Sequence, residues 1–245
     1  MKIIRCTRLA LAACLWAALP AALAGDPFGD LAKSMLPPAA GTALSDSDIG
    51  AGLKEALARG TRTAVNELGR SNGYWGNPRF RIPLPGAVSQ AEGLLQQAGM
   101  GGQLEQLHLS FNRAAEQAVP VAADVFAQAV RQLSLNDVRG ILNGPQDAAT
   151  QYFKRTTSDT LAARFKPIVA RVTAKVGLAQ QYNAVMGSAG PMASMLGVDT
   201  DLDGYVTRKA LDGLFLRVAD EEKSIRTNPA ARTTDLLKRV FGGHS

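Results

Sequence analysis

From Ser45 onward, apolar residues recur at helical spacing, and no convincing run of alternating strand residues appears. In the first long segment Ile49, Leu53, Leu57 and Leu68 follow one another at steps that keep them on one helical face. A half-buried strand would instead alternate apolar and polar residues with a period of two. The pattern therefore predicts an all-α domain.

The helical periodicity and the residues that start and end each segment together predict a single bundle of about nine or ten helices with no significant sheet. Ser134 and Asp137 have the spacing of a capping box at the start of one of these helices. Pro167 falls inside another and should kink it. The expected helices span 46–68, 86–98, 103–118, 121–133, 135–142, 146–156, 159–176, 179–186, 206–226 and 229–241.

The first residues have the features of a bacterial export signal. Basic residues at 2, 5 and 8 precede an apolar run at 9–19, and small residues end at Ala24. Residues 11–14 also resemble a lipoprotein box ending at Cys14, but only five apolar residues precede that cut. Signal cores usually contain about seven or more, so we expect cleavage after Ala24 and a periplasmic protein.

Four regions follow from this interpretation. They are a cleaved signal at 1–24, a flexible arm rich in Pro, Gly and Ala at 25–44, a helical domain at 45–242 and a tail at 243–245. The apolar run of the signal is shorter than the roughly 20 residues that cross a bilayer, and no later segment approaches that length. We therefore expect no transmembrane segment.

Cleavage changes the charge and the chemistry of the chain. Three of the 27 basic residues leave with the signal, so 24 remain against 21 acidic residues. No basic block with interleaved aromatics remains, and we expect no nucleic-acid partner. Cys6 and Cys14 leave as well, which excludes a disulfide or a thiolate nucleophile in the remaining chain.

An aromatic loop at 69–85 is the first candidate binding site. It concentrates Tyr74, Trp75 and Phe80 beside three arginines, between segments broken by Asn-Gly and proline. Large aromatic side chains most often serve a core, so the loop can plug the end of the bundle. Alternatively, it binds a ligand, because loops commonly carry function.

A polar column on one helix is the second candidate. His108, Asn112 and Glu116 are spaced four residues apart and therefore share a helical face. The column can line a pocket in which His108 or Glu116 acts as a general acid or base. The alternative is a hydrogen-bonded structural network, as most buried polar groups form.

An acidic segment is the candidate metal site. Asp199, Asp201, Asp203, Tyr205 and Thr207 occupy positions of an EF-hand-like calcium loop, with a glycine at 204. The twelfth position is alanine, where that loop needs a bidentate glutamate. The alternative to calcium is an acidic cap on a helix that begins near residue 206. No other cofactor is expected.

The residue inventory limits catalysis. The remaining chain has only His108 and His244, too few for a three-histidine zinc site. A carboxylate hydrolase would have to use Glu116, Glu221 or Glu222, of which the last two lie in a charged run at 220–223 that should be solvated. The inventory thus favours a protein without catalytic activity and leaves a carboxylate hydrolase as the alternative.

Five separated blocks resemble the bacterial exported family catalogued as domain of unknown function 4197. The resemblance covers roughly residues 44–242 and implies a helical protein of Gram-negative envelopes with no established activity. In that family the Asp equivalent to Asp203 is usually kept without all three aspartates, which favours the cap over calcium. The blocks are GLKEAL at 52–57, NRAAE at 112–116, DAATQYF at 147–153, YVTRKALDGLF at 205–215 and NPAARTT at 228–234.

Together these features favour a binding module of the bacterial periplasm. Its partner would be a small ligand or an envelope protein, bound in a groove between helices. Two alternatives remain at this stage, a carboxylate-dependent hydrolase of an envelope glycan and a calcium-stabilised structural or interaction protein.

Overall fold

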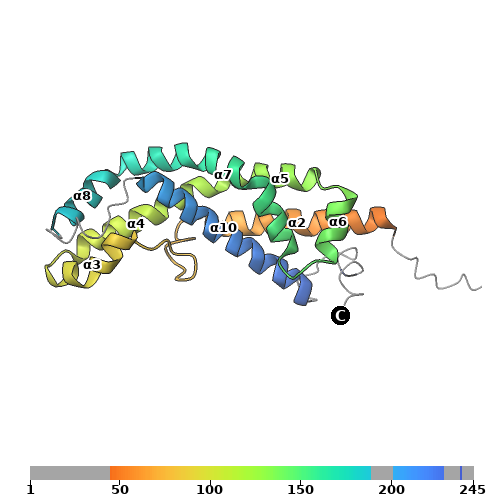
Figure 1. The fold of residues 1–245 in the computed structure, drawn as a ribbon, viewed down its shortest axis with the longest axis horizontal. Helices are drawn as coiled ribbons and strands as arrows, with labels where there is room; N and C mark the ends of the chain where they lie inside the picture. The colour runs from red at the N-terminus through yellow and green to blue at the C-terminus, as the bar shows by residue number, and fades with distance from the viewer. Residues whose placement is uncertain (1–44, 189–200, 229–237, 239–245) are drawn as a thin grey trace, which may run out of the picture. The chain divides into compact units, whose positions relative to one another are not determined.

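A computed structural model describes residues 45–188, 201–228 and 238. The chain divides into two units, Met1–Ala43 and Leu44–Ser245, and all described residues belong to the second. They contain helices and turns but no strand, which confirms the all-α prediction for this part of the chain (Figure 1). The predicted signal, arm, tail and helix at 229–241 lie outside the described residues, except for Lys238.

The described residues form fewer helices than the nine or ten expected. Most of the predicted helices are present with small changes at their ends. They are α2 (Asp46–Leu68), α3 (Gly86–Gln97), α4 (Gly101–Ala118), the 3-10 turn η1 (Val119–Val121), α5 (Ala122–Arg131), α6 (Leu135–Leu142), α7 (Ala148–Lys175), α8 (Leu178–Ser188) and α10 (Leu202–Thr227).

Helix α7 replaces two predicted helices, so the predicted break at residues 157–158 is wrong. The hydroxyls of Thr156, Thr157 and Ser158 each donate to the carbonyl four residues earlier, at 2.9, 2.6 and 2.7 Å. Hydroxyls bonded in this way lie within a helix without interrupting its backbone. The helix also continues through Pro167.

The buried face of α7 turns around the helix along its length. Buried residues recur every four positions from Phe153 to Thr173. At 3.6 residues per turn each step of four advances about 40°, so five steps turn the buried face by about 200° around the helix. The apolar pattern therefore changes phase along α7, although the helix is unbroken.

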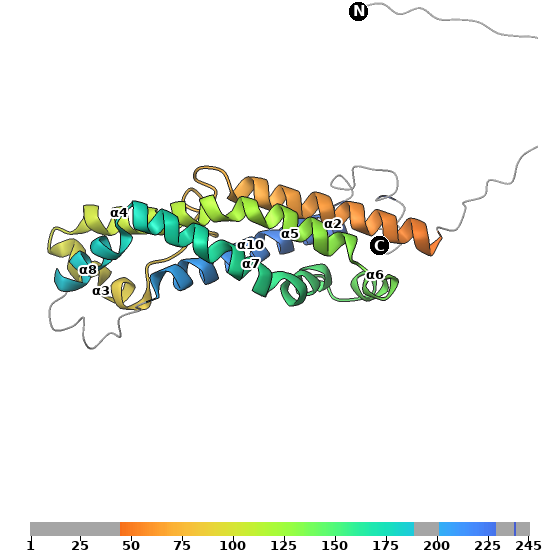
Figure 2. The ribbon, with the colours of Figure 1, turned by 90° about the horizontal axis from the view of Figure 1, so that it is seen from above.

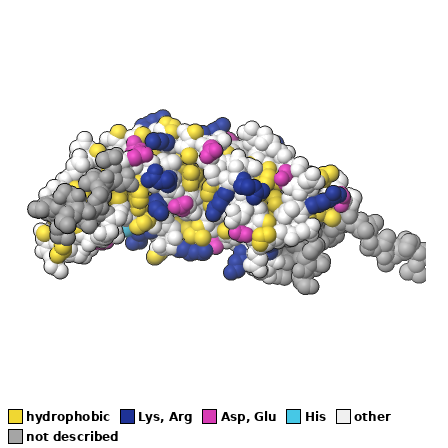
Figure 3. Space-filling view, in the orientation of Figure 1, with side chains coloured by type: hydrophobic (Ala, Val, Ile, Leu, Met, Phe, Trp, Pro, Cys, Tyr) yellow, Lys and Arg dark blue, Asp and Glu magenta, His cyan; other side chains and the backbone are white. Residues whose placement is uncertain are grey.

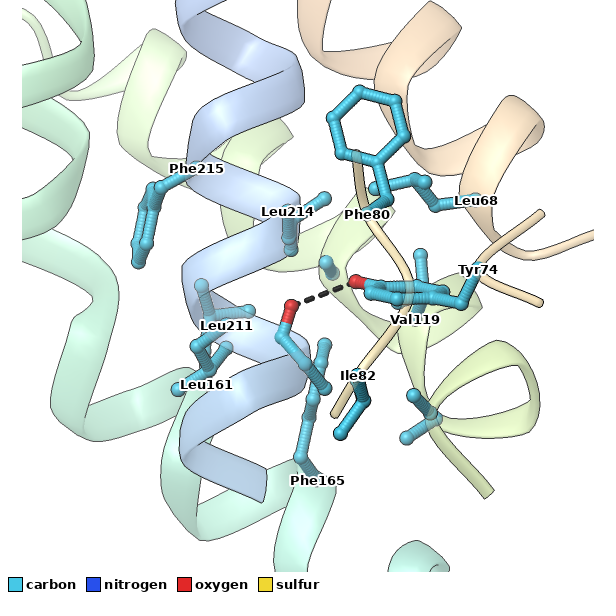
Figure 4. Packing of buried hydrophobic residues seen from close by; sticks show 14 of the residues in the cluster. Leu68, Tyr74, Phe80, Ile82, Val119, Leu161, Phe165, Leu211, Leu214 and Phe215 are labelled. Atoms are coloured by element: carbon cyan, nitrogen blue, oxygen red, sulfur yellow. Dashed lines mark hydrogen bonds between the residues drawn. The ribbon is translucent and has the colours of Figure 1, made fainter. Parts of the chain in front are cut away.

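Helices α7 and α10 lie side by side (Figures 1 and 2), and together they contact most of the other helices. Helix α4 packs on both of them, while α2 packs on α10 and α5. Figure 4 shows that Leu161 and Phe165 of α7 lie close to Leu211 and Leu214 of α10 in the core.

Glycines let α10 approach two of its neighbours closely. A Cβ on Gly60 of α2 would lie 3.3 Å from the Cβ of Glu221, tighter than most real contacts. A Cβ on Gly213 of α10 would lie 2.7 Å from Cε1 of Tyr74. A methyl group at Gly213 would therefore force the Tyr74 ring to shift, whereas one at Gly60 would require its neighbour to move by a few tenths of an ångström.

Side chains cap α2 and α6 as their spacing predicts. Ser134 and Asp137 form the predicted capping box at the start of α6, and Ser45 with Asp48 forms another at α2. Helix α10 begins at Leu202, earlier than the predicted residue 206.

Glu222 corrects the prediction that residues 220–223 form a solvated run. Its side chain is buried, and its carboxylate accepts from the backbone N–H groups of Ala149 at 3.0 Å and Thr150 at 2.8 Å. These amides lie in the first turn of α7, where no intrahelical acceptor is available. Arg226 donates to the same carboxylate and to the carbonyl of Ile141. Glu222 therefore caps a helix other than its own.

Replacing Glu222 with Ala should destabilise the fold by about 3 kcal/mol, because Arg226 and two amides would lose a buried partner. Urea denaturation followed by circular dichroism measures the change. Asp212→Ala, at an exposed position on the same helix, should change the free energy of unfolding by less than about 0.5 kcal/mol. Equal effects of the two variants would contradict the capping role.

Candidate functional site

The aromatic loop at 69–85 packs tightly against the C-terminal end of α2. Asn72 has a positive φ of 66°, and the glycine after it lies against backbone. A Cβ on Gly73 would come within 2.5 Å of the carbonyl oxygens of Glu67 and Leu68. The Asn-Gly pair thus makes a turn that only a residue without a side chain can complete at position 73.

Glu116 of α4 holds the first half of this loop. Its Oε1 accepts from the backbone N–H groups of Tyr74 and Trp75, both at 3.1 Å. Its Oε2 accepts from Arg113 at 2.6 Å, and Arg113 also donates to the side chain of Asn72 at 2.7 Å. The carboxylate is buried and accepts three hydrogen bonds, so its oxygens are already used in holding the loop.

Asn112 and His108 hold the second half. Asn112 Oδ1 accepts from the Ile82 N–H at 2.8 Å, and its Nδ2 donates to the Ile82 carbonyl at 3.1 Å. His108 Nε2 lies 2.7 Å from the same carbonyl. Because a carbonyl oxygen only accepts, Nε2 carries the proton. We call the contacts of His108, Asn112 and Glu116 with the loop the α4 clamp.

Two of the three aromatic side chains of the loop lie in the core. Tyr74 and Phe80 are buried, and the Tyr74 hydroxyl donates to the Ala210 carbonyl at 2.6 Å (Figure 4). Burial, followed by the charges of Glu116 and Asp212, raises the pKa of Tyr74 well above its ordinary value, so the phenol stays a donor. The structure thus brings the aromatic loop and the polar column of α4 together, and the two predicted ligand-binding groups bind each other.

Trp75 is half-buried and lies between two polar side chains. Its ring meets the His108 ring edge-on at 5.1 Å, and the Arg81 guanidinium lies 4.4 Å from the centre of the Trp75 ring. Arg81 Nε also donates to the Trp75 carbonyl at 2.9 Å. Trp75 thus lies between His108 of the α4 clamp and Arg81 of the loop.

The acidic segment forms the start of α10. Asp201 is the N-cap residue, and its carboxylate accepts from Gly204 N–H at 2.9 Å, which lowers its pKa. Asp203 accepts from the Thr173 hydroxyl at 2.6 Å. This geometry is that of a helix cap.

The remaining predicted calcium ligands are not arranged as a loop. Tyr205 and Thr207 are already helical, and the Tyr205 hydroxyl donates to the Pro83 carbonyl at 2.9 Å. Asp199 lies outside the described residues. Within the described ranges no three His, Cys, Asp or Glu side chains gather as metal ligands would. The calcium site stays a prediction.

A groove that the sequence did not indicate lies between α7 and α10. It has a volume of about 580 Å³, and small side chains line much of it. Lys166 and Arg208 add cationic groups, and Thr207 is buried beside them. The lining residues are Ala162, Ala163, Lys166, Pro167, Ala170, Asp201, Gly204, Thr207 and Arg208.

A second hollow of about 350 Å³ lies next to the first, and both are lined by Ala170 and Asp201. It extends toward the start of α8 and is lined partly by Thr173, Gln180 and Asp203. In sequence the groove appears only as alanines around Pro167, a pattern that also fits ordinary helix packing. Nothing in the spacing indicated that α10 would leave these alanines uncovered.

The comparisons with known proteins identify the family. The family model described as "Protein of unknown function (DUF4197)" matches residues 43–242. The chain belongs to the DUF4197 family. No curated protein and no solved structure gives a match. The DUF4197 match spans both the α4 clamp and the groove, and its description assigns no activity to either.

Asn112→Ala should lower the free energy of unfolding by about 2 kcal/mol, because the Ile82 N–H loses its acceptor inside the core. Urea denaturation followed by circular dichroism measures this. Gln117→Ala, at an exposed position on the same helix, is the matched control and should have little effect. If both variants unfold at the same urea concentration, Asn112 does not hold the loop.

His108 should make stability depend on pH. Burial lowers its pKa, and Arg81 adds to this, while the bond to Ile82 and the charge of Glu92 act in the opposite direction. Because the folded-state pKa lies below the ordinary value near 6.5, the unfolded chain binds the proton more readily. The contribution of His108 is therefore complete above about pH 6.5 and is lost as pH falls toward the lowered pKa.

His108→Gln should remove this part of the pH dependence. Thermal unfolding of both proteins between neutral and mildly acidic pH provides the comparison. The parent protein should lose more stability than the variant across that interval. Parallel profiles would show that His108 does not titrate differently in the folded state.

Proposed function

We propose that this protein is a ligand-binding module of the bacterial periplasm, and that its ligand occupies the groove between α7 and α10. The observation that carries the proposal is the groove itself. Its volume of about 580 Å³ falls within the range of small-molecule sites, roughly 300–1,000 Å³. Its lining combines apolar surface with a few polar and charged groups, as such sites usually do.

Binding fits the remaining chemistry better than catalysis by the predicted carboxylates. Glu116 and Glu222 are buried and bound to backbone amides of the loop and of α7. Glu221 forms an ion pair with Arg217 on the same helix. Each carboxylate therefore has a structural task, and none of the three lines the groove.

The proposed location rests on the first residues of the sequence. The basic residues, apolar run and small residues ending at Ala24 have the order of an export signal. In the described part of the chain, every helix is too short or too polar to cross a bilayer. Export would place the groove where it can meet ligands of the cell envelope.

Filling the groove should abolish binding. Ala163 is exposed and lies in the lining, so Ala163→Trp adds a bulky ring without entering the core. Native mass spectrometry of protein purified from its host should detect a bound small molecule on the parent chain. The molecule should be missing from Ala163→Trp.

Ala51→Trp is the matched control, because Ala51 is an exposed helical alanine that does not line the groove. This variant should retain the molecule. If the parent chain carries no molecule, or if both tryptophan variants retain it equally, the groove is not the binding site. Circular dichroism should show that all three proteins are folded.

A further inference from the structure

We propose that the groove binds a single-chain anionic amphiphile, such as a free fatty acid, with its carboxylate between Lys166 and Arg208 and its tail along the alanines of α7. This inference rests on the proposed function and names the chemical class of the ligand. Three features carry it: the cations at the rim, the small apolar lining and a buried hydroxyl.

The rim of the groove favours an anion. Lys166 of α7 and Arg208 of α10 stand on opposite helices and both line the groove. The acid in the lining, Asp201, is 3.4 Å from Lys166, and the charge of Arg208 also acts on it. The side chains of Lys166 and Asp201 are both more than half exposed. Such an exposed pair is weak, and Lys166 can exchange it for a ligand carboxylate at little cost.

The surroundings add to this positive potential. Helix α7 carries six basic residues and one acidic residue, and all six basic side chains are exposed. Figure 3 shows Lys and Arg side chains spread over the face that includes α7 and α10, with hydrophobic and acidic side chains between them. A field of this sign attracts anions to the groove before contact is made.

The apolar part of the groove suits a narrow, flexible tail. Ala162, Ala163 and Ala170 present methyl groups, and Pro167 presents its ring. Gly204 adds no side chain on the facing helix. A polymethylene chain can lie along such a surface and remove its apolar area from water, at roughly 25 cal/mol per Å².

Thr207 supplies a polar group that the fold does not satisfy. Its side chain is only 4% exposed, and its hydroxyl has no hydrogen-bond partner in the described part of the chain. Buried hydroxyls are normally paired, because desolvation without a partner is unfavourable. Thr207 lines the groove, and rotation of its side chain would bring this hydroxyl within reach of a carboxylate beside Arg208.

Three single-chain probes of nearly equal alkyl length separate charge from apolar burial. They are dodecanoate, dodecanol and dodecyltrimethylammonium, titrated calorimetrically into the purified chain. The two ions are kept below their micelle-forming concentrations and dodecanol below its solubility limit. Dodecanoate should bind most tightly, and added salt should weaken its binding because the rim is exposed. Ala163→Trp should prevent its binding.

Two charge-matched double variants locate the anion site. Lys166→Gln with Arg208→Gln should weaken dodecanoate binding about tenfold, equivalent to about 1.4 kcal/mol. Arg164→Gln with Arg171→Gln removes the same charge from α7 outside the groove lining and should change the affinity much less. Thr207→Val should weaken binding while it raises the melting temperature of the free protein, because an unpaired buried hydroxyl is removed.

Several outcomes would overturn the inference. Equal binding of all three probes would show an apolar groove without anion preference, and equal losses in the two double variants would show attraction to the general charge of α7. Unchanged affinity in Thr207→Val would remove the carboxylate from that position. If no probe binds while a native ligand is still lost in Ala163→Trp, the ligand class is wrong and the proposed function stands.

Discussion

The structure depends on side chains that satisfy backbone groups which no helix can satisfy. The aromatic loop contains turns but no helix or strand, yet parts of its backbone are buried with Tyr74 and Ile82. Buried N–H and C=O groups need partners, and an apolar core offers none. Glu116 and Asn112 provide those partners from one face of α4. The loop can then place its tyrosine against α10, which ties α2, α4 and α10 together.

The same principle operates at α7. The first turn of this helix has free N–H groups, and Glu222 accepts from two of them across the interface with α10. Both buried glutamates therefore join elements that are distant in sequence. This arrangement explains how a chain without cysteines in its described part obtains specific, directional contacts. The groove between α7 and α10, by contrast, has no evident structural role among the described residues.

Much of the fold could be predicted from the sequence because its signals are local. The capping box at Ser134 and the helix boundaries around α6 depend only on neighbouring residues. The prediction of two helices in place of α7 was wrong. The buried face turns around this helix, so its apolar residues do not form one straight stripe. The burial of Glu222 could not be predicted, since the backbone amides that it accepts from lie more than seventy residues earlier in the chain.

For the candidate sites, too, the sequence indicated local features but not contacts between distant segments. The spacing of His108, Asn112 and Glu116 indicated a shared polar face, but only the fold shows that this face meets the aromatic loop. The groove depends on how α7 and α10 are placed side by side, and alanine composition does not specify that placement. The sequence thus indicated which polar residues share a helical face, but it did not indicate which groups those residues contact.

Amide hydrogen exchange tests the α4 clamp most directly, because it reports individual N–H groups. The amides of Tyr74, Trp75 and Ile82 donate to α4 side chains and belong to no helix. We predict that they exchange as slowly as the central amides of α4, through opening of the whole bundle. Exchange at the rate of unprotected loop amides would contradict the clamp as the interaction that organises the fold.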